Sequence, residues 1–370
     1  MGERVLLLGA GASFGARDGL LGWSNYDTPP RGNALATYLV EWFKRNNPAT
    51  RGDTDTCPVH HEIDNPLCTD CAGDQLWTDE GIGDVIVALA DVATNEPGKS
   101  DEPTPFEGLM QSWSEAEHQL FGPTHRLLAY AMNFGNSRAF VECRDRLDHL
   151  IARVEPTIVV TVNYDTLTEE ALRRRGLRGS HPGLGHPGGG HGQVSPGVGQ
   201  IVPVFKLHGS VNWMQVPSRS GSATYEEAQS TGRDRTTYGT QSGPLPGVQT
   251  RETSATFDRP SLKVDLENGE NPVIAVYGRG KHVIANSQHI DEHRATCLRR
   301  LAEAPIDCVI AVGIRPVSEE DDPVVGKVID LLAAGARHKV CADPNADQCA
   351  EFERRGFTSA RSTLEQFLAS

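Results

Sequence analysis

The chain has 370 residues, with 38 glycines, eight cysteines and a formal net charge of −14. That length can hold two domains or one large domain with insertions, and the negative charge argues against a broad nucleic-acid-binding surface, which needs clustered lysine and arginine. No apolar run approaches the roughly 20 residues that a membrane span requires, and no signal peptide is visible. The sequence therefore predicts a cytoplasmic protein whose cysteines are thiols or metal ligands.

The N-terminal stretch predicts a strand, a glycine turn and a helix. An apolar run at residues 4–8 is followed directly by Gly9, Ala10, Gly11, Ala12 and Ser13. Glycines let a backbone approach a pyrophosphate closely, and the next helix N-terminus offers unpaired N–H groups. The spacing departs from the usual dinucleotide fingerprint, because the glycine after Gly11 is Gly15. The alternative interpretation is a tight strand-to-helix turn without a ligand.

Residues 46–155 predict an inserted helical module that begins with a polar, irregular segment. This segment holds four soft metal ligands in two close pairs, Cys57 with His60 or His61, and Cys68 with Cys71. Such pairs are typical of structural, tetrahedral zinc sites. The alternative is a polar loop whose cysteines occur by chance. We predict a closed zinc site, in the manner of a zinc knuckle, distant from any cofactor.

Two later strands end in polar side chains. The apolar run at residues 157–162 is followed by Asn163 and Asp165, and the run at residues 201–207 is followed by His208. An imidazole with a near-neutral pKa can take a proton from water or from a sugar hydroxyl. The alternatives are that Asp165 caps a helix and that His208 is a satisfied core histidine.

The remaining apolar runs predict an α/β fold, a Rossmann-like parallel sheet wrapped by helices. We expect three further strands, at residues 272–278, 307–313 and 338–343. Ligands of such sheets bind outside the carboxyl ends of the strands. Gly9–Ser13, Asn163–Asp165, His208 and Gly313 are all expected at that edge.

Three segments make up the expected sheet domain, residues 1–45, 156–214 and 271–370. Residues 46–155 form the helical module, and residues 215–270 form a polar insertion that is poor in apolar side chains. A loop rich in glycine and histidine spans residues 176–199, and we interpret it as a polar loop over the cofactor.

In combination, these motifs resemble the sirtuin-like NAD-binding superfamily. "GAGAS" at residues 9–13 resembles its first phosphate loop, "TVNYDTL" at residues 161–167 resembles its T-x-N-x-D-x-L motif, and "KLHGS" at residues 206–210 resembles the strand with its catalytic histidine. The resemblance implies NAD+ as substrate, with Asn163, Asp165 and His208 as catalytic residues. It also implies cofactor contacts by Gly9, Ala10, Gly11, Ala12, Ser13, Asn163, Asp165, Gly313 and Asp343.

Departures from the protein deacylases of this superfamily indicate a different branch. Deacylases carry two C-x-x-C pairs soon after the catalytic histidine, whereas no cysteine occurs between Cys143 and Cys297. Their Pro-Asp-Phe-Arg segment after the glycine loop is also missing. The resemblance is therefore to bacterial enzymes that hydrolyse NAD+ to nicotinamide and ADP-ribose, often in antiphage defence.

The same resemblance bears on partners and on alternative activities. It implies homo-oligomers and a separately encoded partner, such as a HerA-family hexameric ATPase, which would restrain or trigger the hydrolase. Two other functions stay open at this point. One is NAD-dependent deacylation or ADP-ribosyl transfer on the same scaffold, and the other is a regulatory subunit that binds NAD or ADP-ribose without catalysis.

Overall fold

The computed structural model describes residues 2–13, 35–46, 80–93, 105–115, 124–125, 127–128, 138–182, 200–217, 248–252, 272–274 and 288–370. The chain divides into two compact units. The first, here called the Rossmann unit, consists of Met1–Arg17, Val141–Gly209 and Gln288–Ser370. The second unit consists of Asp18–Phe140 and Ser210–Ser287.

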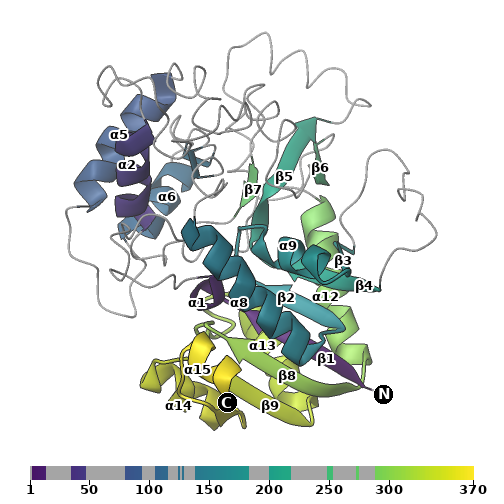
Figure 1. Cartoon of the computed structure of the whole chain (residues 1–370). Coiled ribbons are helices and arrows are strands. Elements are labelled where there is room, and N and C mark those ends of the chain that lie inside the picture. The colour runs from purple at the N-terminus through teal and green to yellow at the C-terminus, as the bar shows by residue number, and fades with distance from the viewer. Residues whose placement is uncertain are drawn as a thin grey trace. The chain divides into compact units, whose positions relative to one another are not determined.

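A seven-stranded sheet forms the centre of the Rossmann unit (Figure 1). Across the sheet the strands are β10 (Thr358–Ser359), β9 (His338–Ala342), β8 (Ile306–Val312), β1 (Glu3–Leu8), β2 (Ile158–Thr161), β4 (Ile201–Lys206) and β3 (Arg178–Ser180). Every neighbouring pair is parallel. The expected α/β fold with a Rossmann-like parallel sheet is therefore confirmed.

The strand order changes direction next to β1. From β1 the chain first builds β2, β3 and β4 on one side, and it later returns to build β8, β9 and β10 on the other side. A doubly wound sheet of this kind has a switch point where the two halves meet, here between β1 and β8. Ligands of such sheets bind outside the carboxyl ends of the strands at that point.

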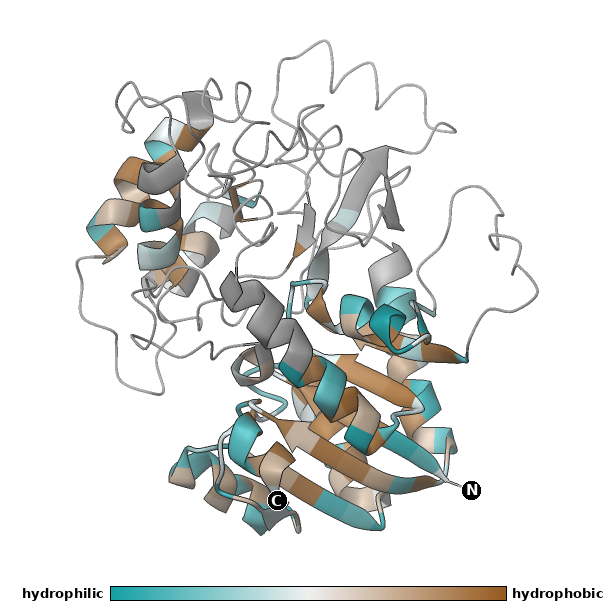
Figure 2. Cartoon of the chain, viewed as in Figure 1, coloured by the Kyte–Doolittle hydropathy of each residue, from teal (hydrophilic) through white to brown (hydrophobic). Residues whose placement is uncertain are grey.

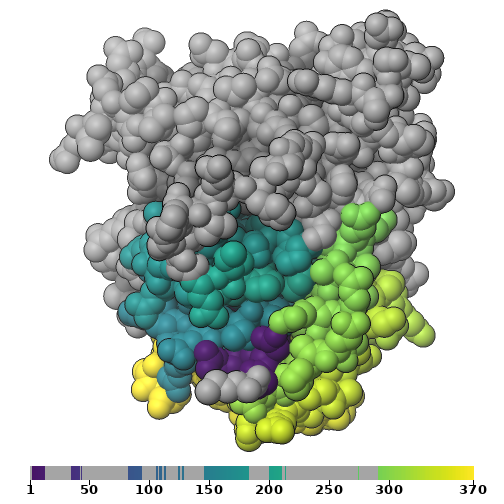
Figure 3. Space-filling view, turned by 90° about the vertical axis from the view of Figure 1, so that its right-hand side faces the viewer, coloured from purple at the N-terminus to yellow at the C-terminus, as the bar shows by residue number. Residues whose placement is uncertain are grey.

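Helices flank the sheet of the Rossmann unit. They are α1 (Ala10–Ser13), α8 (Arg138–Val154), α9 (Leu167–Arg174), α12 (Gln288–Glu303), α13 (Pro323–Gly335), α14 (Ala346–Arg354) and α15 (Leu364–Ala369). In Figure 1, α8 passes in front of the strands, and α12 and α13 lie behind them. Figure 3 shows α12, in green, at the surface beside the teal residues of the segment 141–209.

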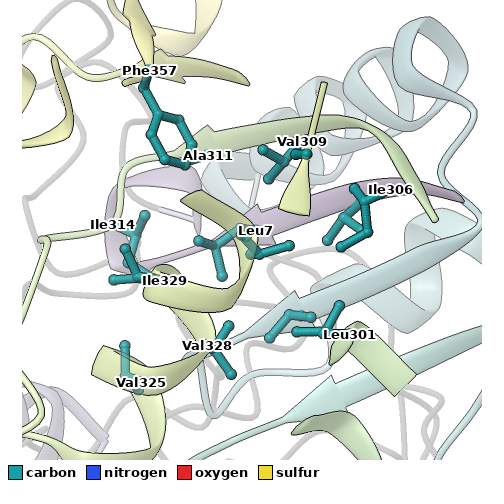
Figure 4. Packing of buried hydrophobic residues seen from close by; sticks show 14 of the residues in the cluster. Leu7, Leu301, Ile306, Val309, Ala311, Ile314, Val325, Val328, Ile329 and Phe357 are labelled. Carbon is teal, nitrogen blue, oxygen red and sulfur yellow. The ribbon is translucent and has the colours of Figure 1, made fainter. Parts of the chain in front are cut away.

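Both faces of the sheet are buried along the apolar part of its central strand β1. Val5 and Leu7 of β1 belong to a core cluster with residues of α12 and α13, including Leu301 and Val328 (Figure 4). Leu6 and Leu8 point to the opposite face, because successive side chains of a strand alternate, and they too are fully buried. Central parallel strands therefore read as continuous apolar runs, and hydrophobic residues concentrate in these strands in Figure 2.

The second unit contains helices and a small separate sheet. Its described helices are α2 (Leu35–Asn46), α5 (Glu80–Ala93) and α6 (Pro105–Glu115). The sheet has the order β6 (Val248–Glu252), β5 (Gly209–Pro217) and β7 (Pro272–Ile274), and β5 and β6 are antiparallel. The apolar stripe of α2 packs against α5, and its central Leu39 is fully buried.

The units differ from the domain boundaries that the sequence suggests. Pro272–Ile274 lies in the three-stranded sheet and not in the parallel sheet, where a strand at 272–278 was expected. Val248–Glu252, inside the expected polar insertion, forms strand β6. Helix α2 belongs to the second unit, and α8 from Val141 onward belongs to the Rossmann unit. Short or amphipathic segments fit either unit by composition, so only long-range packing decides between them.

None of the helices in the described ranges combines the length and the apolar character needed to cross a bilayer.

Candidate functional site

The register of the parallel sheet aligns the carboxyl ends of its strands. Leu8 of β1 pairs with Val312 of β8 and with Thr161 of β2, and Thr161 pairs with Lys206 of β4. On the other side Val312 pairs with Ala342 of β9. The residues that follow these strand ends therefore share one edge of the Rossmann unit, and the predicted site residues among them are Gly9, Asn163, His208, Gly313 and Asp343.

The glycine turn after β1 packs directly on the end of β8. A Cβ atom at Gly9 would lie 2.5 Å from the carbonyl oxygen of Gly313, and one at Gly11 would lie 2.7 Å from the Cα of Gly313. Gly313 has a φ of 57°, which favours glycine. The Gly11 N–H donates to the Gly313 carbonyl oxygen at 2.9 Å, and the Ala12 N–H donates to that of Gly9 at 2.9 Å. Close packing between two backbone segments of the chain thus explains why glycine occupies these positions, as the tight-turn interpretation requires. Pyrophosphate binding by this turn stays a prediction.

Asn163 connects the end of β2 to this turn. Its side-chain Nδ2 donates to the carbonyl oxygen of Gly9 at 3.0 Å, and its own N–H donates to Oγ1 of Thr161 at 3.0 Å. The side chain is buried. Asn163 therefore links the end of β2 to the glycine turn that follows β1.

Asp165 supports the start of α9. Its Oδ1 accepts a hydrogen bond from the N–H of Leu167 at 3.0 Å, whereas the N-cap residue Thr166 makes no side-chain capping bond. Asp165 therefore binds a backbone N–H in the first turn of α9, which is close to the helix-capping alternative given for it above. Its predicted catalytic role stays a prediction.

His208 forms a short contact with a residue that sequence analysis missed. Its Nε2 lies 2.6 Å from Oδ2 of Asp322, and both side chains are buried. Asp322 is the N-cap of α13, where its Oδ1 accepts from the N–H of Val325 at 3.0 Å. The Asp-Pro pair at the helix start is a sequence signal for an N-cap. Nothing in the sequence links it to a histidine 114 positions earlier.

A buried ionic cluster lies beside this edge. Lys206 has no exposed surface, and its Nζ contacts Oε1 of Glu169 at 2.9 Å and donates to the carbonyl oxygen of Asp165. His181 Nε2 lies 3.6 Å from the same Glu169 oxygen. Breaking a buried pair by removing one partner typically costs about 3–5 kcal/mol. Lys206 therefore anchors the connection that carries Asn163 and Asp165.

His293 of α12 is a second buried histidine near β4. Its Nε2 accepts from the Lys206 N–H at 3.0 Å, so its Nδ1 carries the proton and donates to the carbonyl oxygen of Pro182 at 2.6 Å. Burial, and then the neighbouring His181, lower the pKa of His293 to about 3. The ring is therefore neutral at physiological pH and acts as a structural hydrogen-bonding group.

Asp343 organises the turn after β9. Its Oδ1 accepts from the N–H of Asn345 at 2.8 Å, and Asn345 in turn caps α14. The Gly313 N–H donates to the Ala342 carbonyl oxygen at 3.2 Å, so the ends of β8 and β9 are joined. Contact of Gly313 and Asp343 with a cofactor stays a prediction.

The predicted zinc ligands Cys57, His60, Cys68 and Cys71 lie outside the described residues. Within the described ranges, no group of three or more histidine, cysteine or acidic side chains could hold a metal ion. Two of the described cysteines, Cys297 and Cys341, have pKa values raised chiefly by burial. Buried thiols of that kind are structural rather than reactive.

No protein-family model matches the chain, and a search of curated proteins finds no match.

Proposed function

We propose that the protein hydrolyses NAD+ at the bond between nicotinamide and ribose and that it is an effector of antiphage defence. One observation carries the proposal. Asn163 and His208 follow the ends of adjacent strands, beside a glycine turn at the switch point of a doubly wound sheet. This is where such sheets bind dinucleotides. Asn163 and His208 are also the residues that the resemblance to the sirtuin-like superfamily implies as catalytic.

The proposed reaction replaces nicotinamide by water. The C–N bond to ribose breaks, and nicotinamide leaves as a neutral molecule with the bonding electron pair. This creates an oxocarbenium-like centre, as in other glycosyl cleavages. The oxygen of water bonds to that carbon, and the proton that it loses passes to His208 as general base. The products are nicotinamide and ADP-ribose.

The remaining residues would bind and orient the substrate. The turn Gly9–Ser13 would hold the pyrophosphate, and Gly313 and Asp343 would face the adenosine half. Asn163 would hold the ribose or the attacking water, and Asp165 would orient the ribose or Asn163. Binding energy from the distant half of the dinucleotide would thus position the reacting sugar.

The direct test is to incubate the purified protein with NAD+ and to measure nicotinamide and ADP-ribose. His208→Ala and Asn163→Ala should each lower the rate by about 10²–10⁴, the usual value of an acid–base group. The matched control is His338→Ala, because His338 is exposed and begins β9 at the opposite edge of the sheet. It should leave the rate unchanged.

Two outcomes would replace the proposal with another function. Calorimetric binding of NAD+ or ADP-ribose without any cleavage would indicate a regulatory subunit. Release of nicotinamide only in the presence of an acylated peptide or a protein acceptor would indicate a deacylase or an ADP-ribosyltransferase. A folded His208→Ala protein with the wild-type rate would remove His208 from the reaction.

A further inference from the structure

The contact between His208 and Asp322 joins two residues that are each fixed independently. On the histidine side, the N–H of Leu207 donates to the Thr161 carbonyl oxygen at 2.9 Å. The Leu207 carbonyl oxygen accepts from Nε of Arg294, also at 2.9 Å. The next residue, Gly209, has a φ of 81° that favours glycine. The backbone that carries His208 is therefore held on both sides.

Asp322 is held equally firmly at the start of α13. Its N–H donates to the Ser318 carbonyl oxygen at 3.0 Å, and its Oδ1 accepts from the Val325 N–H at 3.0 Å. Gly326, one turn into the helix, packs so closely that a Cβ atom there would lie 2.5 Å from the backbone N of Glu319. One carboxylate oxygen thus accepts a hydrogen bond from the helix, and the other contacts His208.

We propose that Asp322 is the positioning residue of His208, which it holds in the neutral tautomer with the proton on Nε2. The inference rests on the proposed function in one respect, that His208 is the general base. A carboxylate can only accept a hydrogen bond, so Nε2 is the donor across the 2.6 Å contact. The lone pair of the neutral ring then lies on Nδ1, and Nδ1 is the atom that takes the proton from water.

The helix N-terminus reinforces this arrangement. The positive end of the α13 dipole and the N–H of Val325 both favour the ionised form of Asp322. When Nδ1 of His208 takes a proton, the adjacent carboxylate stabilises the imidazolium that results. An orienting carboxylate with this effect on a catalytic imidazole is a general device of enzymes.

Other ionisable groups also surround His208. The ring of Tyr164, in the connection after β2, has its centroid 6.5 Å from that of His208. Arg294 of α12 binds the carbonyl oxygen of the preceding residue. Lys206, two residues earlier on β4, has its ammonium engaged by Glu169. These groups are the same in every variant below, so differences between variants report on position 322.

The decisive variant is Asp322→Asn. Asparagine is as good an N-cap as aspartate, so Oδ1 can still accept from Val325 and the melting temperature should stay close to wild type. Its Nδ2, however, would donate to Nε2 of His208 and would drive the ring proton to Nδ1. NAD+ cleavage should fall by about 10²–10⁴, and the acid limb of the remaining pH–rate profile should move to lower pH.

The tautomer of His208 can be measured directly, without any substrate. Nitrogen-15 NMR of histidine-labelled protein, with the His208 signal assigned by its loss in His208→Gln, should show a protonated Nε2 in wild type. In Asp322→Asn it should show a protonated Nδ1. The matched control is Thr363→Ala, which removes the N-cap of α15. It should lower the melting temperature and leave both the rate and the His208 tautomer unchanged.

The two arms separate this inference from the proposed function. If the protein does not cleave NAD+ but the tautomer changes as expected, hydrolysis fails while Asp322 remains the residue that fixes His208. If Asp322→Asn cleaves NAD+ at the wild-type rate with an unchanged tautomer, the inference is overturned and hydrolysis stands. A wild-type ring with the proton on Nδ1 overturns the inference outright. The inference is also overturned if the activity of Asp322→Asn falls only in proportion to its folded fraction, because Asp322 would then be a helix cap alone.

Discussion

Buried histidines of the Rossmann unit differ in the groups that hold them, and this difference has consequences for stability. His208 faces a carboxylate, whereas His293 sits between a backbone N–H and a backbone carbonyl. The second arrangement satisfies only the neutral ring. His293 is fully buried, and its pKa is lowered to about 3.

The pH dependence of folding should show the effect of His293. An unfolded histidine has a pKa of about 6.5, so between pH 6.5 and about 3 the unfolded chain binds a proton that the folded chain excludes. Stability from this residue is present above pH 6.5 and is lost as the pH falls through that window, by at most about 1.4 kcal/mol per pH unit. Urea unfolding of wild type and His293→Gln at pH 7, 6, 5 and 4 measures the difference.

The glutamine in this variant can accept from Lys206 and donate to Pro182, and it cannot be protonated in this range. The free energy of unfolding should therefore fall more steeply with acid in wild type than in His293→Gln. His338→Gln, at an exposed position, serves as the control and should follow wild type. Parallel curves for wild type and His293→Gln would contradict the prediction.

Single residues also show the limit of what the sequence alone reveals about the site. Asn163 and His208 could be placed at one edge because each directly follows an apolar run, and parallel strands end on the same side. Asp322 could be recognised as a helix start. Its contact with His208 could not, because it depends on how α13 packs on the sheet after 114 intervening residues.

At the scale of elements, the buried strands were predictable and the peripheral strands were not. β1, β2, β4 and β8 each contain an apolar run, because helices cover both faces of the sheet, and β9 ends in the buried residues Cys341 and Ala342. β3, β6 and β10 have the sequences RGS, VQTRE and TS, and they carry no periodic apolar signal. The order of the strands in the sheet could not be predicted from the sequence either, because it is set by pairing between distant segments.

The proposed zinc site belongs to the helical module and is testable without any structural assumption. Protein purified without added zinc should contain about one zinc per chain. Cys68→Ser should lose the metal, because it removes one of four ligands. Hydrogen exchange should then increase in α2, α5 and α6 more than in the strands of the Rossmann unit.

Cys308→Ser is the control for the zinc experiment, because Cys308 lies on β8 outside the predicted ligand set. It should keep the metal. A native protein without zinc, whose melting temperature is the same before and after treatment with a chelator, would reject the site.

At the scale of the whole molecule, the proposed NAD+ hydrolase would need control, and the polar insertion at residues 215–270 is the candidate segment. We expect the protein to form homo-oligomers and to depend on assembly, or on a partner such as a HerA-family ATPase, for activity. Deleting residues 220–245 spares the described strands β5 and β6. The deletion should change the mass measured by light scattering more than the affinity for NAD+ measured by calorimetry.

The matched control replaces residues 220–245 with a glycine-serine linker of equal length. It should behave like the deletion if the sequence of the insertion makes the contacts, and like wild type if only the connection matters. A monomeric wild-type protein that is as active alone as with any added partner would contradict the regulatory prediction.

The pairing of β1 has a consequence for how the protein is made. Leu8 pairs with Thr161 on one side and with Val312 on the other, so the central strand leaves the ribosome long before its second neighbour exists. At about 5–20 residues per second, the ribosome needs roughly 15–60 s to make the intervening 300 or so residues. During that interval one edge of β1, whose last four residues are apolar and buried in the folded protein, has no partner, and such edges promote aggregation. Early chaperone contact with the first residues should therefore decide how much of the newly made chain reaches the folded state.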